Sequence, residues 1–419
     1  MYRFGKNFVA KKLLPFLARR VLKKYEPDVV AITGSVGKTS VREAIFCVLR
    51  SKFQVRQSIR NYNDEFGVPL TILGEESAGR NIFGWLKIAL KGLKLILFHH
   101  NYPEILVLEM AADRPGDIRY LAQLVPIKVA VVTSIGPTHL ESFDTIENIA
   151  DEKEVLVKAL QKDGTAILNF DNPWTRKMKE SSKGRTLTYG FEDGADVGAT
   201  GLEENIESSN LKLSFKLNYR GNVIPIRLFN VLGKSQVYAA LAGAAVGVVF
   251  RMNLVDISKA LRKYVAPCGR MRIISGIKNT QILDDTYNAV PESAISALEV
   301  LSGFKDERKI AVLGDMLELG LYTEKGHRKV GDKVAQVCDF LVVVGPRAKF
   351  ISDQARKNGM SDNNIFEFDT ADEAKMLVQN KIEPQDVILV KGSRAMKMEK
   401  IVKEIMAHPE KADEVLVQD

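Results

Sequence analysis

Short apolar segments alternate with segments of helical periodicity through most of the chain. Buried strands are predicted at residues 29–33, 105–109, 129–133 and 166–169, with helical segments between them. Because strands that are joined through helices usually pair in parallel, the first half is predicted to form a mostly parallel sheet covered by helices. The pattern indicates the α/β fold class.

The pattern changes further along the chain. Short alternating strands such as 212–217 are predicted between residues 185 and 228, and a long alanine-rich helix follows at 236–250. A proline and glycine cluster at 266–269 marks the predicted domain boundary. Four more strands, each followed by a helix, indicate a second, Rossmann-like α/β unit. They are predicted at 282–284, 309–313, 340–344 and 387–390. The domains expected are therefore an N-terminal arm, a central nucleotide-binding domain and a C-terminal domain, at 1–27, 28–266 and 267–419.

Composition limits the class of protein. The 419 residues are enough for two or three domains with cores of their own. Cys47, Cys268 and Cys338 are scattered without paired spacing, which favours a reducing compartment and argues against structural zinc. No apolar run reaches eighteen residues, and the leading apolar stretch at 13–18 is too short for a signal peptide. A cytoplasmic protein is expected.

The net charge of +8 is concentrated at the N-terminus. Residues 1–24 contain eight basic side chains and no acidic one, so the rest of the chain carries equal numbers of bases and acids. The eight are Arg3, Lys6, Lys11, Lys12, Arg19, Arg20, Lys23 and Lys24. A nucleic-acid-binding enzyme more often spreads its positive charge over a folded face, and no helix-turn-helix or RNA-binding motif is present. Nucleic acid is not expected as a partner.

The segment "AITGSVGKTSVRE" at residues 31–43 has the form of a strand, a glycine turn and a helix. Gly34 and Gly37 permit tight turns, which point backbone N–H groups and the positive end of a helix dipole at one anion site. Lys38 adds a full charge there, and the Thr39 hydroxyl suits a magnesium ion. Only two residues separate Gly34 from Gly37, where the usual phosphate loop has four. The segment alone therefore predicts a nucleoside triphosphate site only weakly, and a structural turn remains the alternative.

Polar groups also follow two predicted strands. Glu109 lies at the tip of the strand in "VLEM", and His139 comes shortly after another strand, in "TSIGPTHLE". Open α/β sheets bind ligands at such strand ends, and a carboxylate there suits magnesium. The alternatives are an acid that caps a helix or forms a salt bridge and a structural histidine. Together with the phosphate loop, the two residues favour a metal–nucleotide site.

Six further segments, taken with the phosphate loop, resemble the Mur ligases, the ATP-dependent ligases of cell-wall peptidoglycan synthesis. They are "NYNDEFGVPLTIL" at 61–73, "LVLEMAADRPGDI" at 106–118, "TSIGPTHLESFDTIENIADEKEVL" at 133–156, "ILDDTYNAVPESAISAL" at 282–298, "LGDMLELG" at 313–320 and "ILVKGSRAMKMEKIV" at 388–402. The last three resemble the branch of the family that joins D-alanyl-D-alanine to a muramoyl-tripeptide precursor. The similarity spans about residues 29–405, and motifs in order over that length are far more specific than any one motif.

The resemblance implies an amide-forming ligase that activates a carboxylate with ATP. It implies ATP contacts from the loop residues Gly34, Ser35, Val36, Gly37, Lys38, Thr39 and Ser40. It also implies that Thr39 and Glu109 hold a first Mg²⁺ and that His139 helps to hold a second. Two cations suit phosphoryl transfer because charge builds up on several oxygens in the transition state.

Lys153 matches the position at which the family carries a carbamylated lysine, which becomes a metal ligand. Carbamylation needs a lysine that is partly neutral beforehand. The alternative for Lys153 is an exposed helical residue that pairs with Asp151, Glu152 or Glu154.

The resemblance extends to the predicted C-terminal domain, which in the family closes on ATP. Arg270 and Asp285 match nucleotide contacts, and Asp285 would either bind the ribose or order its loop. Asn288 lies in the same loop, where it would line the peptide site. Turn chemistry before Pro291 is the alternative for Asp285 and Asn288. Lys391 and Arg394 would receive an acidic substrate, or alternatively cap and solvate helix ends.

The chain departs from the family pattern in two places. The helix that approaches adenine has Ser235, Gln236 and Ala239 where the family usually has histidine and asparagine, which leaves Gln236 to bond a base edge. In addition, only about thirty residues precede the phosphate loop, whereas this branch normally has a domain there that grips a UDP-sugar. The departure raises the expectation of a lipid-linked rather than a UDP-linked acceptor.

Two predicted helices resemble interfacial helices. A stripe of Leu14, Leu17, Ala18, Val21 and Leu22 recurs at helical spacing near the N-terminus, with basic residues beside it. The segment "GWLKIALKGLKLILF" at 84–98 aligns three lysines along one face of an apolar helix. Each helix is expected either to contact an anionic membrane, on its inner face, or to pack against the body of the protein or a second subunit.

The function expected is therefore a Mur ligase, acting as a monomer with ATP and Mg²⁺ on a muramoyl-peptide precursor and D-alanyl-D-alanine. Two alternatives stay open. One is another ligase of the superfamily, such as a folylpolyglutamate-synthase-like enzyme, against which "LGDMLELG" and "VKGSR" argue. The other is a non-catalytic scaffold, against which the intact Gly-Lys-Thr, Glu109 and His139 argue.

Overall fold

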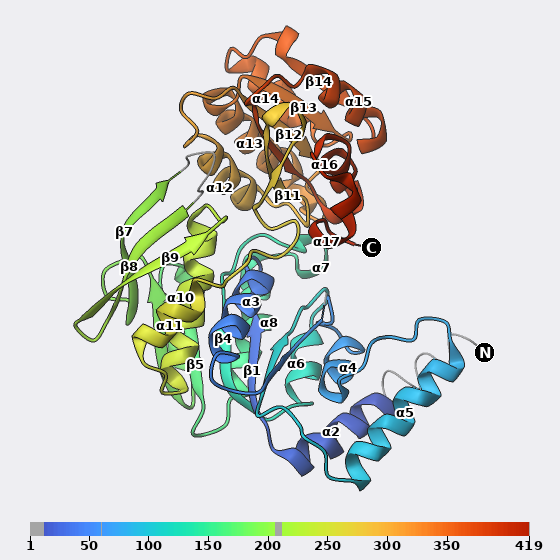
Figure 1. The fold of residues 1–419 in the computed structure, drawn as a ribbon, viewed down its shortest axis with the longest axis vertical. Coiled ribbons are helices and arrows are strands. Elements are labelled where there is room, and N and C mark those ends of the chain that lie inside the picture. The colour runs from blue at the N-terminus through green and yellow to red at the C-terminus, as the bar shows by residue number, and fades with distance from the viewer. Residues whose placement is uncertain (1–11, 60, 206–211, 419) are drawn as a thin grey trace.

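The computed structural model describes residues 12–59, 61–205 and 212–418. The first eleven residues, which include Arg3, Lys6 and Lys11 of the expected basic arm, lie outside the described part. Figure 1 shows two sheets, one above the other, with helices α2 and α5 projecting at the lower right. No helix of the described residues is both long enough and apolar enough to cross a bilayer.

The lower sheet has the strand order β2-β3-β1-β4-β5-β6-β7-β8-β9. Its strands are β1 (Asp28–Thr33), β2 (Val55–Gln57), β3 (Ile105–Glu109), β4 (Ile127–Val132), β5 (Thr165–Asn169), β6 (Arg185–Gly190), β7 (Val197–Asn205), β8 (Lys212–Tyr219) and β9 (Asn222–Phe229). Pairing is parallel from β2 to β7 and antiparallel from β7 to β9. The order reverses at β1, which lies between β3 and β4, so the segment after β1 occupies a topological switch point.

Helices cover both faces of this sheet. Alternate residues of β1 enter opposite cores: Val30 and Ile32 pack with α3, α10 and α11, whereas Val29 and Ala31 pack with α2, α4, α6 and α8. The helices of this part are α2 (Leu14–Tyr25), α3 (Lys38–Leu49), α4 (Gly67–Leu73), α5 (Ile82–Leu97), α6 (Asp117–Ala122), α7 (Leu140–Phe143), α8 (Ile146–Lys158), α9 (Pro173–Lys177), α10 (Lys234–Val249) and α11 (Leu254–Leu261), with the 3₁₀ turn η2 (Met178–Ser181).

The upper sheet has the order β10-β11-β15-β12-β13-β14 and is parallel except for β10. Its strands are β10 (Arg272–Ser275), β11 (Gln281–Asp285), β12 (Lys309–Gly314), β13 (Phe340–Val344), β14 (Ile365–Phe368) and β15 (Val387–Lys391). Its helices are α12 (Pro291–Leu301), α13 (Thr323–Val337), α14 (Lys349–Lys357), α15 (Ala371–Lys381), α16 (Glu399–Ile405) and α17 (Ala412–Val415), with 3₁₀ turns η3 (Ile277–Asn279), η4 (Gly320–Tyr322), η5 (Asp362–Asn364), η6 (Arg394–Met396) and η7 (Pro409–Lys411). Helices α12 to α14 pack on one face and α15 and α16 on the other.

The predicted α/β fold class is confirmed. Each strand predicted from an apolar run is present, and three short strands at sheet edges or near them, β2, β10 and β14, were not predicted. Such strands have too few residues to show a period of their own.

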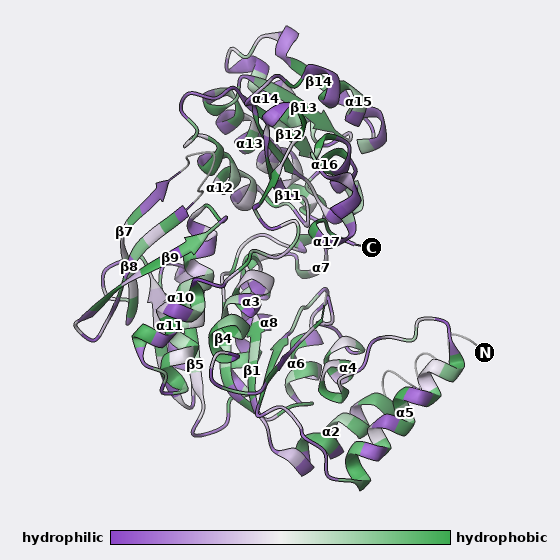
Figure 2. Cartoon of the chain, viewed as in Figure 1, coloured by the Kyte–Doolittle hydropathy of each residue, from purple (hydrophilic) through white to green (hydrophobic). Residues whose placement is uncertain are grey.

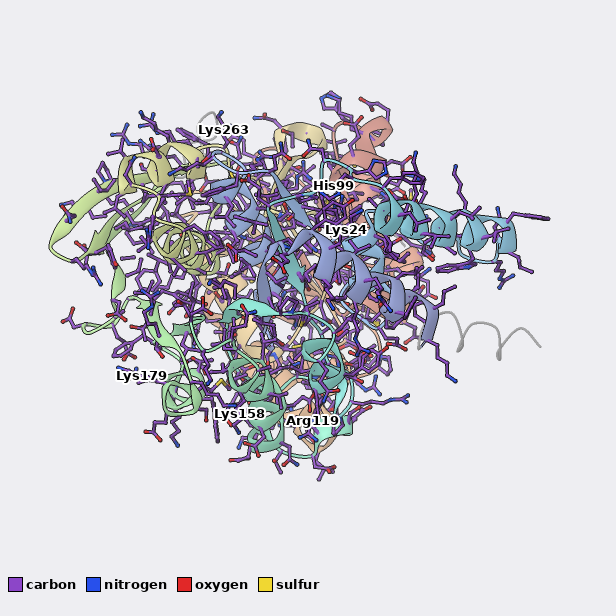
Figure 3. All side chains as sticks on the ribbon, turned by 90° about the horizontal axis from the view of Figure 1, so that it is seen from below. Lys24, His99, Arg119, Lys158, Lys179 and Lys263 are labelled. Atoms are coloured by element: carbon purple, nitrogen blue, oxygen red, sulfur yellow. The ribbon has the colours of Figure 1, made fainter. Side chains whose placement is uncertain are left out.

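The two predicted amphipathic helices have different surroundings. The stripe of α2, from Leu14 to Leu22, is buried in the core beneath the sheet, so the alternative of packing on the body is correct for this helix. Lys24 of α2 donates from Nζ to the carbonyl oxygens of Leu95, Ile96 and Phe98, and this caps the C-terminal end of α5. Figure 3 shows α5 extending away from the rest of the chain, with Lys24 and His99 labelled near its attached end.

Candidate active site

The predicted phosphate loop connects β1 to α3 and is held against the end of β4. Gly34 has φ +142°, and a Cβ there would lie 2.0 Å from the Thr133 hydroxyl oxygen. Gly37 has φ +88° and precedes the first residue of α3. The hydroxyl group of Thr133 donates to the Val36 carbonyl oxygen at 2.6 Å, and the backbone N–H of Ser35 donates to the Ser134 carbonyl oxygen at 2.7 Å. The loop therefore has a fixed shape that directs the N-terminus of α3 at a neighbouring cavity.

Lys38 is the first residue of α3 and lines that cavity. Its Nζ atom donates to the carbonyl oxygens of Gly34 at 2.7 Å and Ser35 at 3.2 Å. Burial lowers the pKa of Lys38 from its ordinary value, and the negative charge of Glu109 opposes part of that shift. An anionic phosphate in the cavity would relieve the cost of the buried charge. Ser40, two residues further on, is buried.

Thr39 and Glu109 lie side by side, as the metal-site prediction requires. The Thr39 hydroxyl donates to Glu109 Oε1 at 3.3 Å, and the Asn63 side chain donates to the same oxygen at 3.2 Å. Arg42 contacts the other carboxylate oxygen at 3.3 Å. In the part of the chain that is described, no three His, Cys, Asp or Glu side chains form a metal cage. This donor set fits Mg²⁺, which takes one or two protein oxygens and completes its octahedron with phosphate and water.

His139 lies at the contact between the two sheets. Its Nδ1 is 2.6 Å from Glu318 Oε2, which belongs to the loop after β12, and its Nε2 is 3.9 Å from Asp113. Burial lowers the pKa of His139, while the charge of Glu318 acts in the opposite direction. The ring lines the same cavity as Lys38 and Glu109. Its role as a ligand of a second metal stays a prediction.

Lys153 is buried in α8, with 3% of its surface exposed. The alternative of an exposed, paired lysine is wrong, because Glu152 accepts the backbone N–H groups of Gly116 and Ile118 and Glu154 accepts from Lys158. Burial, together with the nearby charge of Lys38, lowers the pKa of Lys153 to about 7. A lysine with this pKa is partly neutral at physiological pH, which is the condition for carbamylation.

Arg270 comes from the segment between the two sheets. Its guanidinium lies 3.9 Å from the centroid of the Tyr287 ring, and the Tyr287 hydroxyl donates to Asn61 at 2.8 Å. Gln236 holds the backbone of Arg270 by donating to its carbonyl oxygen at 3.0 Å, and it accepts from Tyr264 at 2.6 Å. Since Gln236 is 1% exposed, it is placed to position Arg270, and its expected bond to a base edge stays a prediction.

Asp285 and the buried Lys391 form an ion pair at 2.5 Å across β11 and β15. Lys391 also donates to the carbonyl oxygen of Asn288, and Asp285 accepts the backbone N–H of Met271. This arrangement supports ordering of the loop by Asp285. Asn288 lines the first cavity directly, as does Arg394, which pairs with Glu399 at 2.9 Å.

The first cavity has a volume of about 580 Å³, and residues of both α/β units line it. Predicted residues on its wall are Ser35, Val36, Lys38, Glu109, His139, Arg270, Asn288 and Arg394. The wall also includes Asn63, Asp113, Tyr287 and Glu318, to which no sequence pattern assigned a role. All four fall inside the segments that carry the family resemblance, and only the folded chain shows which of their side chains converge.

Comparisons with known proteins identify the family of this chain. The profile of the Mur ligase middle domain matches residues 89–247, and the profile of the Mur ligase glutamate ligase domain matches residues 269–394. The UDP-N-acetylmuramoyl-tripeptide–D-alanyl-D-alanine ligase of Bacillus subtilis is 30% identical over 397 residues, which cover 94% of this chain and 79% of that protein. The enzyme of the same name from Escherichia coli is 29% identical and covers 92% of this chain and 78% of its own length.

A solved structure shows the same fold. MurF ligase from Thermotoga maritima, in complex with ADP, superposes with a TM-score of 0.78 at 27% identity, over 96% of this chain and 84% of that one.

Proposed function

The chain belongs to the Mur ligase family, and from this premise we propose that it is an ATP-dependent ligase of the MurF type. It joins D-alanyl-D-alanine to a muramoyl-tripeptide precursor in peptidoglycan synthesis. The observation that carries the proposal is the convergence on one cavity of the phosphate loop, Glu109 and residues of the second α/β unit. The central and C-terminal domains divide at residues 266 and 267.

The reaction is an activation followed by an amide bond. A carboxylate oxygen of the tripeptide attacks the γ-phosphorus of ATP, the bond to ADP breaks, and an acyl phosphate forms. The amino group of D-alanyl-D-alanine then attacks the acyl carbon, a C–N bond forms, and phosphate and a proton leave. Bound Mg²⁺ supplies neutralisation of the charge that develops on the phosphoryl oxygens.

Each part of the chain has a distinct task in this scheme. Lys38 and Arg270 bind phosphate oxygens, since both are cations that face one cavity. Thr39 and Glu109 would hold the first metal ion, and His139 and a carbamylated Lys153 would hold the second. The loop backbone from Gly34 to Ser40 binds the nucleotide.

Other residues position the nucleotide site or bind the peptide substrate. Gln236 and Asp285 act on the nucleotide site by holding the segments around Arg270. The substrate residues are Asn288, Arg394 and Lys391, the last through the loop that it fixes.

The cofactor, the oligomeric state and the location of the enzyme complete the proposal. The cation is Mg²⁺, because the site offers hard oxygen ligands and few of them. The enzyme works as a monomer, since residues of a single chain complete the cavity. It works in the cytoplasm, in peripheral contact with the inner face of an anionic membrane. The basic N-terminal region favours this membrane contact.

A coupled ADP-release assay tests the function. ADP release that depends on muramoyl-tripeptide and D-alanyl-D-alanine together, with a product heavier by the dipeptide less one water, is the expected result. Glutamate-dependent turnover on a folate would favour the related folate ligases, and absence of turnover would favour a scaffold.

A further inference from the structure

Helix α5 carries an exposed apolar face. Its exposed apolar side chains are Ile82, Phe83, Leu86, Leu90, Leu93 and Leu97, with exposed fractions from 45% for Leu93 to 83% for Phe83. At about 100° per residue, these six positions share an arc of about 100° on the helix. Figure 2 shows α5 mostly in green, broken by purple bands. Single exposed apolar residues are common, but six on one face of one helix mark a contact surface.

The packing of α5 on the protein does not use this face. Ile88 and Gly92 lie on the opposite side and are buried. A Cβ at Gly92 would lie 3.1 Å from Leu17 of α2, so the two helices are in close contact there. The exposed face is therefore left over after the helix has docked on α2 and α4.

Basic residues border the exposed face. Lys94, Lys87 and Lys91 occupy the next arc of about 80°, directly beside the apolar one. Lys91 pairs with Glu75 at 2.7 Å, and neither α5 nor α2 contains an acidic residue. Helix α2, which packs against the buried side of α5, carries Arg19, Arg20, Lys23 and Lys24, and Lys24 caps the C-terminal end of α5. The charged side chains that α5 itself places beside its apolar face are all cations, which complements an anionic lipid surface.

A second cavity links this face to the catalytic residues. Its volume is about 1300 Å³, and it shares Asn61, Asp64, Arg270 and Tyr287 with the first cavity. One part of its wall is Thr39 and Arg42 at the metal site, and another is Ile82 and Trp85 of α5. Ile82 is 77% exposed and so belongs both to the cavity wall and to the outer face. The wall also includes the apolar side chains of Phe66, Leu70, Leu416 and Val417.

We propose that α5 lies on an anionic bilayer and that the second cavity admits an acceptor whose long apolar chain remains in that bilayer. This inference rests on the proposed ligase function and names the class of its acceptor, a muramoyl peptide on a lipid carrier. The peptide carboxylate of the acceptor reaches the site beside Thr39. The polar group that joins the muramoyl peptide to its lipid passes the arginines of the cavity wall, and the apolar lipid chain leaves past Ile82. Ile82 belongs both to the exposed face of α5 and to the wall of the cavity, as this route requires.

Vesicle co-sedimentation tests the docking. The full chain should bind vesicles of phosphatidylcholine with phosphatidylglycerol, bind pure phosphatidylcholine less, and lose binding as salt is raised. Leu90→Glu should weaken vesicle binding by about tenfold. The matched control is Met376→Glu, an apolar residue of α15 with 49% exposure, which should bind as the parent does. Equal binding by the two variants would overturn the docking, as would a stable dimer in solution that Leu90→Glu dissociates.

Acceptor competition tests the substrate class. The same muramoyl tripeptide is offered on a polyprenyl diphosphate in vesicles and on UDP in solution, with D-alanyl-D-alanine as the amine. The expected kcat/KM is about tenfold higher for the lipid-linked acceptor. Ile82→Asp and Leu90→Glu should bring the ratio of the two values towards one, and Met376→Glu should preserve it.

The outcomes separate this inference from the function on which it rests. Equal or faster ligation of the UDP-linked acceptor would overturn the lipid-linked acceptor and leave the ligase function standing. Absence of ligation on both acceptors would overturn the ligase function and the acceptor together. The vesicle measurement needs no turnover, so it judges the docking of α5 in either case.

Discussion

Replacement of Lys153 by methionine should stabilise the protein while removing its activity. The pKa of Lys153 falls from 10.5 to about 7 in the folded chain, a shift that corresponds to about 5 kcal/mol at about 1.4 kcal/mol per pKa unit. Because the unfolded chain binds this proton more tightly, the charged lysine opposes folding. The parent should therefore gain stability as the pH rises through the window from 7 to 10.5. Methionine fills a similar volume without the charge.

The measurement is urea unfolding of parent and Lys153→Met in buffers free of carbon dioxide. The stability advantage of the variant should be about 5 kcal/mol at pH 6 and shrink to about 2 kcal/mol at pH 9, as the parent amine loses its proton. Lys158→Met, at a surface position on the same helix (Figure 3), is the control and should show little difference at either pH. An advantage that does not change with pH, or a variant less stable than the parent at pH 6, would refute the assignment of a buried amine with a low pKa.

The same pKa decides whether the carbamate can form. At pH 7.5 a lysine of pKa about 7 is about three-quarters neutral, whereas an ordinary lysine is neutral about once in a thousand molecules. The expected result is a carbamate signal from ¹³C-labelled bicarbonate that Lys153→Met lacks. Lys153→Ala should lose ligase activity and regain part of it with short carboxylates. Full activity of Lys153→Ala, or a bare amine in active enzyme, would contradict the role.

Three further substitutions test the rest of the site. Lys38→Ala should lower ADP release about a hundredfold with the far-ultraviolet circular dichroism unchanged, because it removes a phosphate contact; near-normal turnover would contradict the nucleotide assignment. Glu109→Gln should raise the Mg²⁺ concentration for half-maximal ADP release by about tenfold, since an amide is a weaker ligand; an unchanged Mg²⁺ requirement would count against the metal site. Lys391→Met should lower the free energy of unfolding by about 3–5 kcal/mol because Asp285 loses its buried partner; the double variant with Asp285→Asn should recover most of it, and no loss in the single variant would show that the pair is not important.

The sequence predicts the strands of the two sheets well because most of them are buried on both faces and form continuous apolar runs. It predicts the strand, glycine turn and helix of residues 31–43 because Gly34, Gly37 and Lys38 lie within five consecutive residues. It does not predict the contact of His139 with Glu318 or that of Arg270 with Tyr287. The first pair joins different sheets, and the second depends on how the segment after α11 folds back, so neither has a sequence spacing that a local pattern can show.

The environment of Lys153 shows the same limit. In sequence it stands among acidic residues on a helix, where an exposed ion pair is the ordinary expectation. The fold assigns Glu152 to the backbone of α6 and Glu154 to Lys158, which leaves Lys153 to point into the core side of α8. Its chemistry depends on burial, and burial depends on which face of α8 packs on the sheet.

Two buried cations near the first cavity, Lys38 and Lys153, repel each other, and bound anions would offset this repulsion. Lys38 and Lys153 each have a lowered pKa, burial is the main cause, and the charge of Lys38 adds to the shift of Lys153. A site that holds two such amines is costly to leave without anions. Triphosphate oxygens would relieve Lys38. A carbamate on Lys153 would turn the repulsion between the two side chains into attraction, so that nucleotide binding and carbamylation each reduce the cost that burial imposes on the site.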